Sequence, residues 1–416
     1  MLQHSNKFMK VMPTIVYYSF YYFIYISYGS SPFCLFNSLI IDMTQKPERF
    51  LALDVFRGMT IVFMIIVNNP GSAPAFSPLD HAAWFGFTPT DLVFPSFLFA
   101  VGNAMSFSLK KFDTLGSGAF IWKVFKRGAI IFLLGYLMYW FPFFKHTADG
   151  WSLSPLKDTR IMGVLQRIGL CYLFASLMIH FLSKRAVIIT SVLLLFGYWA
   201  LLLIFGDHNN PYGMLTNAGT YLDKFLFGDA HLYHGEGVAF DPEGVLSTLP
   251  AIVNVIVGYY AGVFIQQKGK NYESIAKLLL FGALFIFIAV CWNMSFPIGK
   301  KLWTSPFTML TTGIDMILLS ALVYVIDIQN WRQANWPSFF TTVGKNPLPI
   351  YILSEILYTI NDMLSTKNFN FFGWTNTIFQ AIAPGAIGSL IFAIFYMMIC
   401  WCVGKILDKR GIHIRV

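Results

Sequence analysis

The sequence is poor in charged residues. Only 12% of its 416 residues are Asp, Glu, Lys or Arg, roughly half the share usual in soluble domains. This scarcity excludes an ordinary soluble protein, because a water-facing surface needs more charged side chains. Apolar residues make up 56% of the chain and occur in long runs separated by short polar connectors. The solvent for most of the chain is therefore lipid.

Cysteine is also scarce, with five residues in all. Four lie inside apolar runs and Cys34 is isolated, so the sequence predicts neither a disulfide framework nor a spaced zinc site. His231 and His234 stand three residues apart, but this spacing fits no strong zinc pattern. The net charge of +9 comes from basic residues placed singly or in pairs between apolar runs. We therefore expect no metal and no nucleic acid partner.

Ten apolar runs are long enough to cross a bilayer as helices. The predicted fold is an all-α polytopic bundle of about ten transmembrane helices. The runs span residues 51–69, 89–109, 118–141, 161–182, 186–206, 245–266, 276–295, 304–327, 338–360 and 384–407. Within the ninth run, Asn346-Pro347 predicts a break or a kink, since proline cannot continue the hydrogen-bond ladder of a helix.

The basic residues predict the orientation of the bundle. If the segment before the first run is cytoplasmic, most of the 29 Lys and Arg residues fall in cytoplasmic loops or tails. Seven remain outside: Lys145, Lys157, Arg160, Lys224, Lys300, Lys301 and Lys367. This asymmetry agrees with the positive-inside rule and predicts a cytoplasmic C-terminus. The longer connectors lie on the outer side, so the outer face is expected to receive the bulkier substrate.

The first 42 residues have two interpretations. They are either an eleventh span or an extension upstream of the true start at Met43, and we favour Met43 because a polar segment follows it directly. The segment lacks a clean cleavage site and is a poor signal peptide. Residues 43–416 are expected to form one transmembrane domain.

Polar residues within or beside the spans predict two sites, because ionisable side chains in a membrane usually face a cavity or a partner. The outer set contains Asn68, His81, Asp91, Arg160, Arg167, Asp241, Glu243 and Glu355. Arg167 and Asp91 could form a structural salt bridge or a functional pair, and Asp158 with Arg160 is expected to be a solvated pair at a loop end. The inner set contains Arg57, Lys123, Lys126 and Arg127, which could hold an anionic cytosolic cofactor.

Six segments together carry a family resemblance. They are Leu53-Asp54-Val55-Phe56-Arg57-Gly58 followed by Val67-Asn68, then His81-Ala82-Ala83-Trp84 with Gly86, Asp91-Leu92-Val93-Phe94-Pro95, Gly163-Val164-Leu165-Gln166-Arg167 and Phe240-Asp241-Pro242-Glu243-Gly244. The chain resembles the heparan-alpha-glucosaminide N-acetyltransferase family, whose lysosomal member transfers acetyl from cytosolic acetyl-CoA to terminal glucosamine across the membrane. It lacks that member's large luminal domain, and prolines replace a glycine run in the first outward loop.

The resemblance implies roles for particular residues. His81 looks like the family's active-site histidine and Asn68 like its active-site asparagine. A neutral imidazole can accept the proton of the attacking amine, while Asn68 could donate a hydrogen bond to the developing oxyanion and Asp91 could orient His81. Arg57, Lys126 and Arg127 would bind the nucleotide end of acetyl-CoA. Transfer through an acetylated His81 is the alternative route.

The resemblance also implies an amino-sugar or glycan acceptor, the inner membrane of a bacterium as location, and a homodimer. A transporter or permease without chemistry is the alternative class, because it too would explain charged residues within the membrane.

Overall fold

The computed structural model describes residues 50–414, apart from 113–115, 148–149 and 366–368. The chain divides into two units, Met1–Phe50 and Leu51–Val416, and the description below concerns the second. Both interpretations of residues 1–42, and the expected start at Met43, lie outside the described residues.

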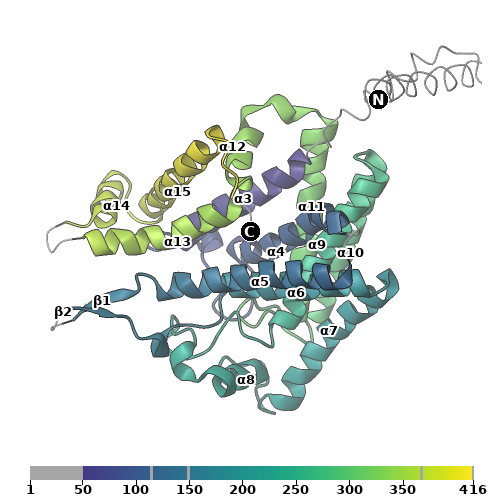
Figure 1. The fold of residues 1–416 in the computed structure, drawn as a ribbon, viewed down its shortest axis with the longest axis horizontal. Helices are drawn as coiled ribbons and strands as arrows, with labels where there is room; N and C mark the ends of the chain where they lie inside the picture. The colour runs from purple at the N-terminus through teal and green to yellow at the C-terminus, as the bar shows by residue number, and fades with distance from the viewer. Residues whose placement is uncertain (1–49, 113–115, 148–149, 366–368, 415–416) are drawn as a thin grey trace, which may run out of the picture. The chain divides into compact units, whose positions relative to one another are not determined.

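The second unit is built almost entirely from helices (Figure 1). The helices are α3 (Leu51–Asn68), α4 (Val93–Ser108), α5 (Ser117–Trp140), α6 (Val164–Phe181), α7 (Lys184–Phe205), α8 (Ala218–Phe227), α9 (Thr248–Lys268), α10 (Tyr272–Trp292), α11 (Ser305–Leu322), α12 (Asn335–Gly344), α13 (Pro347–Leu364), α14 (Phe371–Ile382) and α15 (Ala386–Lys409). Short 3-10 turns occur in several connectors, including η2 (Pro89–Leu92), and a π-helical turn, η6 (Val323–Ile328), extends α11.

Each predicted run coincides with helix, and the all-α membrane class is confirmed. Among the described residues, seven helices are long and apolar enough to cross a membrane: α3, α6, α7, α9, α10, α11 with η6, and α15. The other three runs correspond to α4, which has 16 residues, to α5, and to the broken pair α12 and α13. Lys123, Lys126 and Arg127 lie within α5, so its apolar part is shorter than its length suggests.

Close packing of α4 against α9 forms the centre of the bundle. A Cβ added at Gly258 would lie 2.1 Å from the Phe99 carbonyl oxygen, and one at Gly102 would lie 1.8 Å from that of Val255. Only glycine fits at these positions, as is typical of helices that pack closely in a membrane. The two helices run in the same direction, since contacts pass from Phe99 and Gly258 to Ser106 and Gln266. Their N-terminal ends therefore lie on the same side of the bundle.

The ninth predicted span is broken, as expected. Helix α12 ends at Gly344 and α13 begins at Pro347. The buried Asn346 side chain accepts a hydrogen bond from the Ile414 backbone N–H at 2.9 Å and donates one to the Ile412 carbonyl at 3.0 Å. The C-terminal tail thus satisfies polar groups at the break, as a membrane protein requires of irregular backbone.

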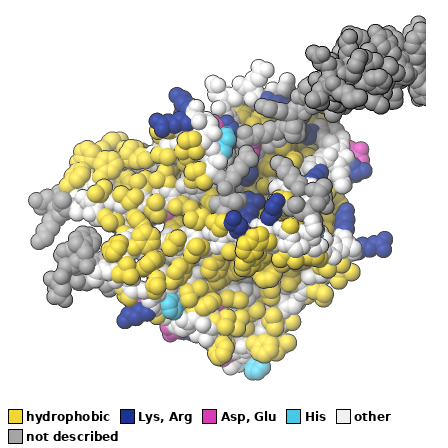
Figure 2. Space-filling model, viewed as in Figure 1, with side chains coloured by type: hydrophobic (Ala, Val, Ile, Leu, Met, Phe, Trp, Pro, Cys, Tyr) yellow, Lys and Arg dark blue, Asp and Glu magenta, His cyan; other side chains and the backbone are white. Residues whose placement is uncertain are grey.

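Apolar side chains cover much of the outside of the bundle. Figure 2 shows a face on which hydrophobic residues dominate. Helices α7 and α10 expose Leu193, Ile204, Leu280 and Phe287, each more than 60% accessible. Such continuous apolar exposure is tolerated in lipid and rarely in water. Beyond α5, strands β1 (Phe144–Thr147) and β2 (Gly150–Leu153) form an antiparallel hairpin in which Phe144 pairs with Leu153.

Candidate functional site

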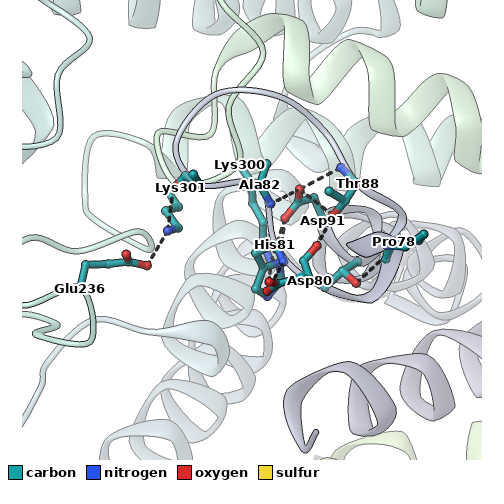
Figure 3. A network of polar contacts seen from close by, with 11 residues as sticks. Pro78, Asp80, His81, Ala82, Thr88, Asp91, Glu236, Lys300 and Lys301 are labelled. Atoms are coloured by element: carbon teal, nitrogen blue, oxygen red, sulfur yellow. Dashed lines mark hydrogen bonds and ion pairs between the residues drawn. The ribbon is translucent and has the colours of Figure 1, made fainter. Parts of the chain in front are cut away.

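A hydrogen-bonded histidine–aspartate pair lies in the connector between α3 and α4 (Figure 3). His81 Nδ1 is 2.7 Å from Asp91 Oδ1, and the His81 side chain is 38% exposed, whereas that of Asp91 is 1% exposed. A carboxylate accepts only, so this contact places the ring proton on Nδ1 and makes Nε2, which Lys300 Nζ approaches at 3.3 Å, the acceptor of the ring. The two residues are ten positions apart, and the structure brings them together, as an orienting role of Asp91 requires.

Asp91 is held in place by the turn η2, which leads directly into α4. Its Oδ2 accepts hydrogen bonds from the backbone N–H groups of Ala82 at 3.2 Å and Thr88 at 3.0 Å, and from the Thr88 hydroxyl at 3.1 Å. Thr88 and Asp91 form a capping box at η2. Burial acts to raise the pKa of Asp91, but the His81 hydrogen bond, the Lys300 charge and the Thr88 backbone N–H outweigh it and lower that pKa. Asp91 is therefore an ionised, fixed partner for His81.

Lys300 and Lys301 complete this site from the connector between α10 and α11. Lys300 Nζ lies 3.1 Å from His81 Nδ1, 3.3 Å from Nε2 and 3.8 Å from Asp91 Oδ1. Lys301 donates to the Ala83 carbonyl at 2.8 Å and pairs with Glu236. Sequence reasoning counted both lysines only as outward charges. Their distance from His81 in the sequence, more than 200 positions, gave no local signal of this contact.

A second group of charges surrounds Arg160. Its guanidinium donates to both oxygens of Asp241, at 3.0 and 2.6 Å, and to Glu243 at 2.6 Å. It also lies over the rings of Tyr139 and Tyr233. The expected pair of Asp158 with Arg160 is wrong, because a guanidinium can bind two carboxylates here and Asp158 is exposed to solvent. Glu243 also interacts electrostatically with Lys300, which links this group to the His81 site.

Arg167 is fully buried, and its Nη2 donates to the Gly244 carbonyl at 3.1 Å and to the Ser247 hydroxyl. The guanidinium lies over the Trp303 ring, 4.9 Å from its centroid. The salt bridge of Arg167 with Asp91 is therefore wrong. The two charges have separate partners because the α8–α9 connector supplies acceptors to Arg167, whereas His81 and Lys300 neutralise Asp91.

Asn68 and Glu355 are brought together. Asn68 is exposed at the C-terminal end of α3, and its side chain hydrogen-bonds the Glu355 carboxyl of α13. Within the described residues no hydrogen bond joins Asn68 directly to His81. The structure thus places Asn68 at the end of the helix that leads into the His81 connector, with Glu355 orienting its amide.

A small cleft with a volume of about 10 Å³, open in part to solvent, adjoins the His81 connector. Its lining includes the aromatic residues Trp84, Tyr198 and Phe240 and the charged residues Asp223 and Lys301, of which Tyr198, Phe240 and Asp223 are buried. Asp223 accepts a hydrogen bond from the Val245 backbone N–H at 2.9 Å, but burial raises the pKa of this carboxyl to about 7. Sequence reasoning missed Asp223, because it lies on the short amphipathic helix α8, outside the predicted spans.

The inner basic residues do not form one site in the structure. Arg57 pairs with Asp54 one turn earlier on α3. Arg127 lies over the Tyr172 ring at 4.8 Å, and Lys126 is exposed. Among the described residues, no ion pair or hydrogen bond connects Arg57 with the α5 residues. Two guanidinium nitrogens here, Nε of Arg57 and of Arg127, are buried without a described partner.

A buried acid that the sequence analysis did not single out lies in α11. Asp315 is fully buried and accepts a hydrogen bond from Ser96 of α4 at 2.5 Å, while its second oxygen has no partner among the described residues. The two closely spaced histidines each form a hydrogen bond with a backbone carbonyl, His231 with that of Thr159 and His234 with that of Leu232. In the described part of the chain, His, Cys, Asp and Glu residues form no group of three suited to a metal.

Comparison with known proteins shows which family this chain resembles. The family model described as "Heparan-alpha-glucosaminide N-acetyltransferase, catalytic" matches residues 49–226, a range that contains Asn68, His81, Asp91 and Arg167. The human heparan-alpha-glucosaminide N-acetyltransferase is 27% identical over 371 positions, covering 76% of this chain and 54% of the human protein. The mouse protein of the same name is 26% identical over 418 positions, covering 87% of this chain and 60% of its own length. The chain thus spans about half to three fifths of these relatives.

Proposed function

We propose that this chain, which belongs to the heparan-alpha-glucosaminide N-acetyltransferase-like family, is a membrane-embedded enzyme that transfers acetyl from acetyl-CoA to an amino sugar. The observation that carries the proposal is the contact of His81 with the buried Asp91, at 2.7 Å. With an ionised Asp91, it supports the ring tautomer in which Nε2 can accept a proton. An exposed imidazole oriented by a buried carboxylate is the arrangement that general base catalysis requires.

The chemical step follows from this geometry. As the acceptor nitrogen attacks the thioester carbonyl carbon, His81 Nε2 takes a proton from that nitrogen. The new C–N bond forms, the C–S bond breaks, and the imidazolium returns the proton to the departing CoA thiolate. Asp91 stabilises the imidazolium through Nδ1–H. Asn68, oriented by Glu355, would donate to the oxyanion. Acetylation of His81 itself is the other route, and exchange of labelled CoA into acetyl-CoA without acceptor would reveal it.

The acceptor would bind against the mouth of the cleft beside the His81 connector. Lining residues such as Trp84 and Lys301 suit a sugar, whose C–H faces pack on rings and whose hydroxyl groups form hydrogen bonds. An ammonium group in this cleft would favour the ionised form of Asp223, because opposite charges stabilise each other.

Acetyl-CoA would enter from the cytoplasmic side, where Arg57, Lys126 and Arg127 would meet its phosphates. Guanidinium groups bind phosphate oxygens through paired hydrogen bonds, and the two buried Nε atoms without a described partner support this placement.

The proposed location is a bacterial inner membrane with the C-terminus in the cytoplasm, and a homodimer is the proposed assembly.

The decisive experiment uses purified full-length protein in proteoliposomes. The proposal expects free CoA thiol to be released from acetyl-CoA only when glucosamine is present, with N-acetylglucosamine as product. His81→Ala should lower turnover by about 10²–10⁴-fold while the protein remains folded. Product formation by His81→Ala at near the parental rate would contradict the assignment of the base.

A carrier without chemistry is the second candidate function, and Asp315 favours it. A fully buried carboxylate facing α4 within a spanning helix is a frequent feature of proton- and ion-coupled transporters. A carrier would accumulate unmodified glucosamine in the proteoliposomes and would release no CoA thiol.

A further inference from the structure

Lys300 has an unusual position for a cation, directly against the imidazole that would accept a proton. Its Nζ is within 3.3 Å of both His81 ring nitrogens and 3.8 Å from Asp91 Oδ1 (Figure 3). We propose that Lys300 is a positioning residue that keeps His81 in its neutral form, the form that can accept a proton, until the acceptor displaces Nζ from Nε2. The catalytic role of Lys300 rests on the proposed function. The contact between Lys300 and His81 does not depend on that function.

The connector that carries Lys300 is fixed to the His81 connector on both sides of the contact. The Gly86 backbone N–H donates to the Ile298 carbonyl at 2.8 Å, and Lys301 donates to the Ala83 carbonyl at 2.8 Å. At Gly299, an added Cβ would lie 3.1 Å from the Trp84 carbonyl oxygen. These contacts hold the two backbones together, so Lys300 cannot move far from His81 without breaking them.

The charges that face His81 are few and of both signs. Asp91 contacts Nδ1, and Asp80 accepts a hydrogen bond from the His81 backbone N–H at 2.9 Å. Lys300 brings the positive charge, while the charge of Lys301 is paired with Glu236. Glu243 acts on Lys300 from the Arg160 group. Burial lowers the pKa of Lys300, and the charges of Asp91 and Glu243 offset this only in part.

The sign of the effect follows from like-charge repulsion. A cation beside an imidazole disfavours the imidazolium form, and charges within about 4–6 Å commonly move a titration by about 1–3 pH units. Lys300 therefore opposes the effect of Asp91. In the reaction, the same repulsion would make the imidazolium a better acid and promote return of its proton to the CoA thiolate.

The test measures the protonation of His81 without relying on catalysis. Diethyl pyrocarbonate modifies neutral imidazole, and the modification rate of the His81 peptide can be followed by mass spectrometry from pH 5 to 9 in detergent-solubilised full-length protein. Lys300→Met should move the midpoint of this profile upward by about 1 pH unit or more. Lys300→Gln, which keeps a donor but no charge, should give the same shift. Lys300→Arg should stay close to the parent.

Two further variants separate charge from structural damage. Lys157→Met removes an exposed lysine of the same outer side and should leave the midpoint unchanged. Asp91→Asn removes a negative charge and should move the midpoint downward, opposite to Lys300→Met. The inference would be overturned if Lys300→Met and Lys300→Gln both had the parental midpoint. It would also be overturned if the midpoints of the Lys300 and Asp91 variants moved in the same direction.

The outcome for Lys300 and the outcome for the proposed function are distinguishable. An upward shift in a protein that never transfers acetyl would leave the Lys300 contact established and refute the enzyme. If the enzyme is active, the acidic limb of its pH–rate profile in Lys300→Met should move in the same direction as the modification midpoint. An active enzyme with an unmoved limb and midpoint would refute the role of Lys300 alone.

Discussion

Replacing Asp91 by asparagine tests the orientation of His81 most directly. Asp91 Oδ2 accepts three hydrogen bonds, from the Ala82 N–H and from the Thr88 N–H and hydroxyl, while Oδ1 faces His81 Nδ1. In Asp91→Asn, an NH₂ group at the Oδ2 position would oppose two backbone donors. The variant should therefore keep its oxygen there and turn its NH₂ toward His81.

That orientation reverses the tautomer of His81. An NH₂ group can only donate, so Nδ1 must become the acceptor and the ring proton must move to Nε2, which then has no lone pair for the acceptor's proton. Loss of a positioned general base corresponds to about 10²–10⁴ in rate, or about 2.7–5.4 kcal/mol of transition-state free energy. The three hydrogen bonds to Oδ2 remain, so the cost in folding stability should be smaller, about 1–3 kcal/mol.

The assay is amino-sugar-dependent release of CoA thiol under saturating substrates, with thermal unfolding measured in parallel. Asp80→Asn is the matched control, because Asp80 contacts the His81 backbone N–H and not the ring; it should retain most of the parental turnover. We expect Asp91→Asn to lose turnover with little change in the Michaelis constant for acetyl-CoA. A folded Asp91→Asn protein with more than half of the parental turnover would refute the reasoning.

Three further predictions concern stability and topology. Arg160→Met leaves the Asp241 and Glu243 carboxylates buried without their cation and should cost about 3–5 kcal/mol, seen as a lower melting temperature than in the exposed control Arg185→Met; equal melting would show that the cluster is not structural. The pKa of Asp223 is raised in the folded state to about 7 from 3.8, so its contribution to stability is present below pH 4 and is lost as pH rises to 7. Asp223→Asn, which cannot ionise, should therefore be more stable than the parent at pH 8, by at most about 4 kcal/mol, and lose this advantage near pH 4; a constant difference at all pH values would contradict it. In a protein without its native cysteines, Ser77→Cys should react with an impermeant maleimide on intact cells and Gln333→Cys should not; equal labelling of both would refute the orientation.

The sequence predicted the spans well because a membrane helix must satisfy its backbone internally and present about twenty apolar residues to lipid. Every predicted run contains helix, and the break at Asn346-Pro347 lies where proline requires it. The runs did not reveal that a short amphipathic helix, α8, follows α7. This feature depends on what neighbouring residues cover, which a hydropathy pattern does not contain.

The candidate site was predicted in part. His81 and Asp91 stand near each other in the sequence and match a motif, so their contact could be expected. The pairing of Arg160 with Asp241 and Glu243, and the approach of Lys300 to His81, join segments that are far apart along the chain. The expected pairs of Asp158 with Arg160 and of Arg167 with Asp91 failed because proximity in sequence or along the membrane normal does not say which side chains share a face.

What the sequence determined by itself is the solvent, the helical class and the reactive residue types, since hydropathy, charge asymmetry and motif spacing are properties of local segments. Only the tertiary structure decided which partners those residues have. Helices α4 and α9 meet through glycines and bring the His81 connector, the Arg160 group and the Lys300 connector to one end of the bundle. A buried charge takes whichever partner the packed backbones bring within reach, because leaving it unpaired costs several kcal/mol. Partner choice is therefore fixed by packing and not by order along the chain.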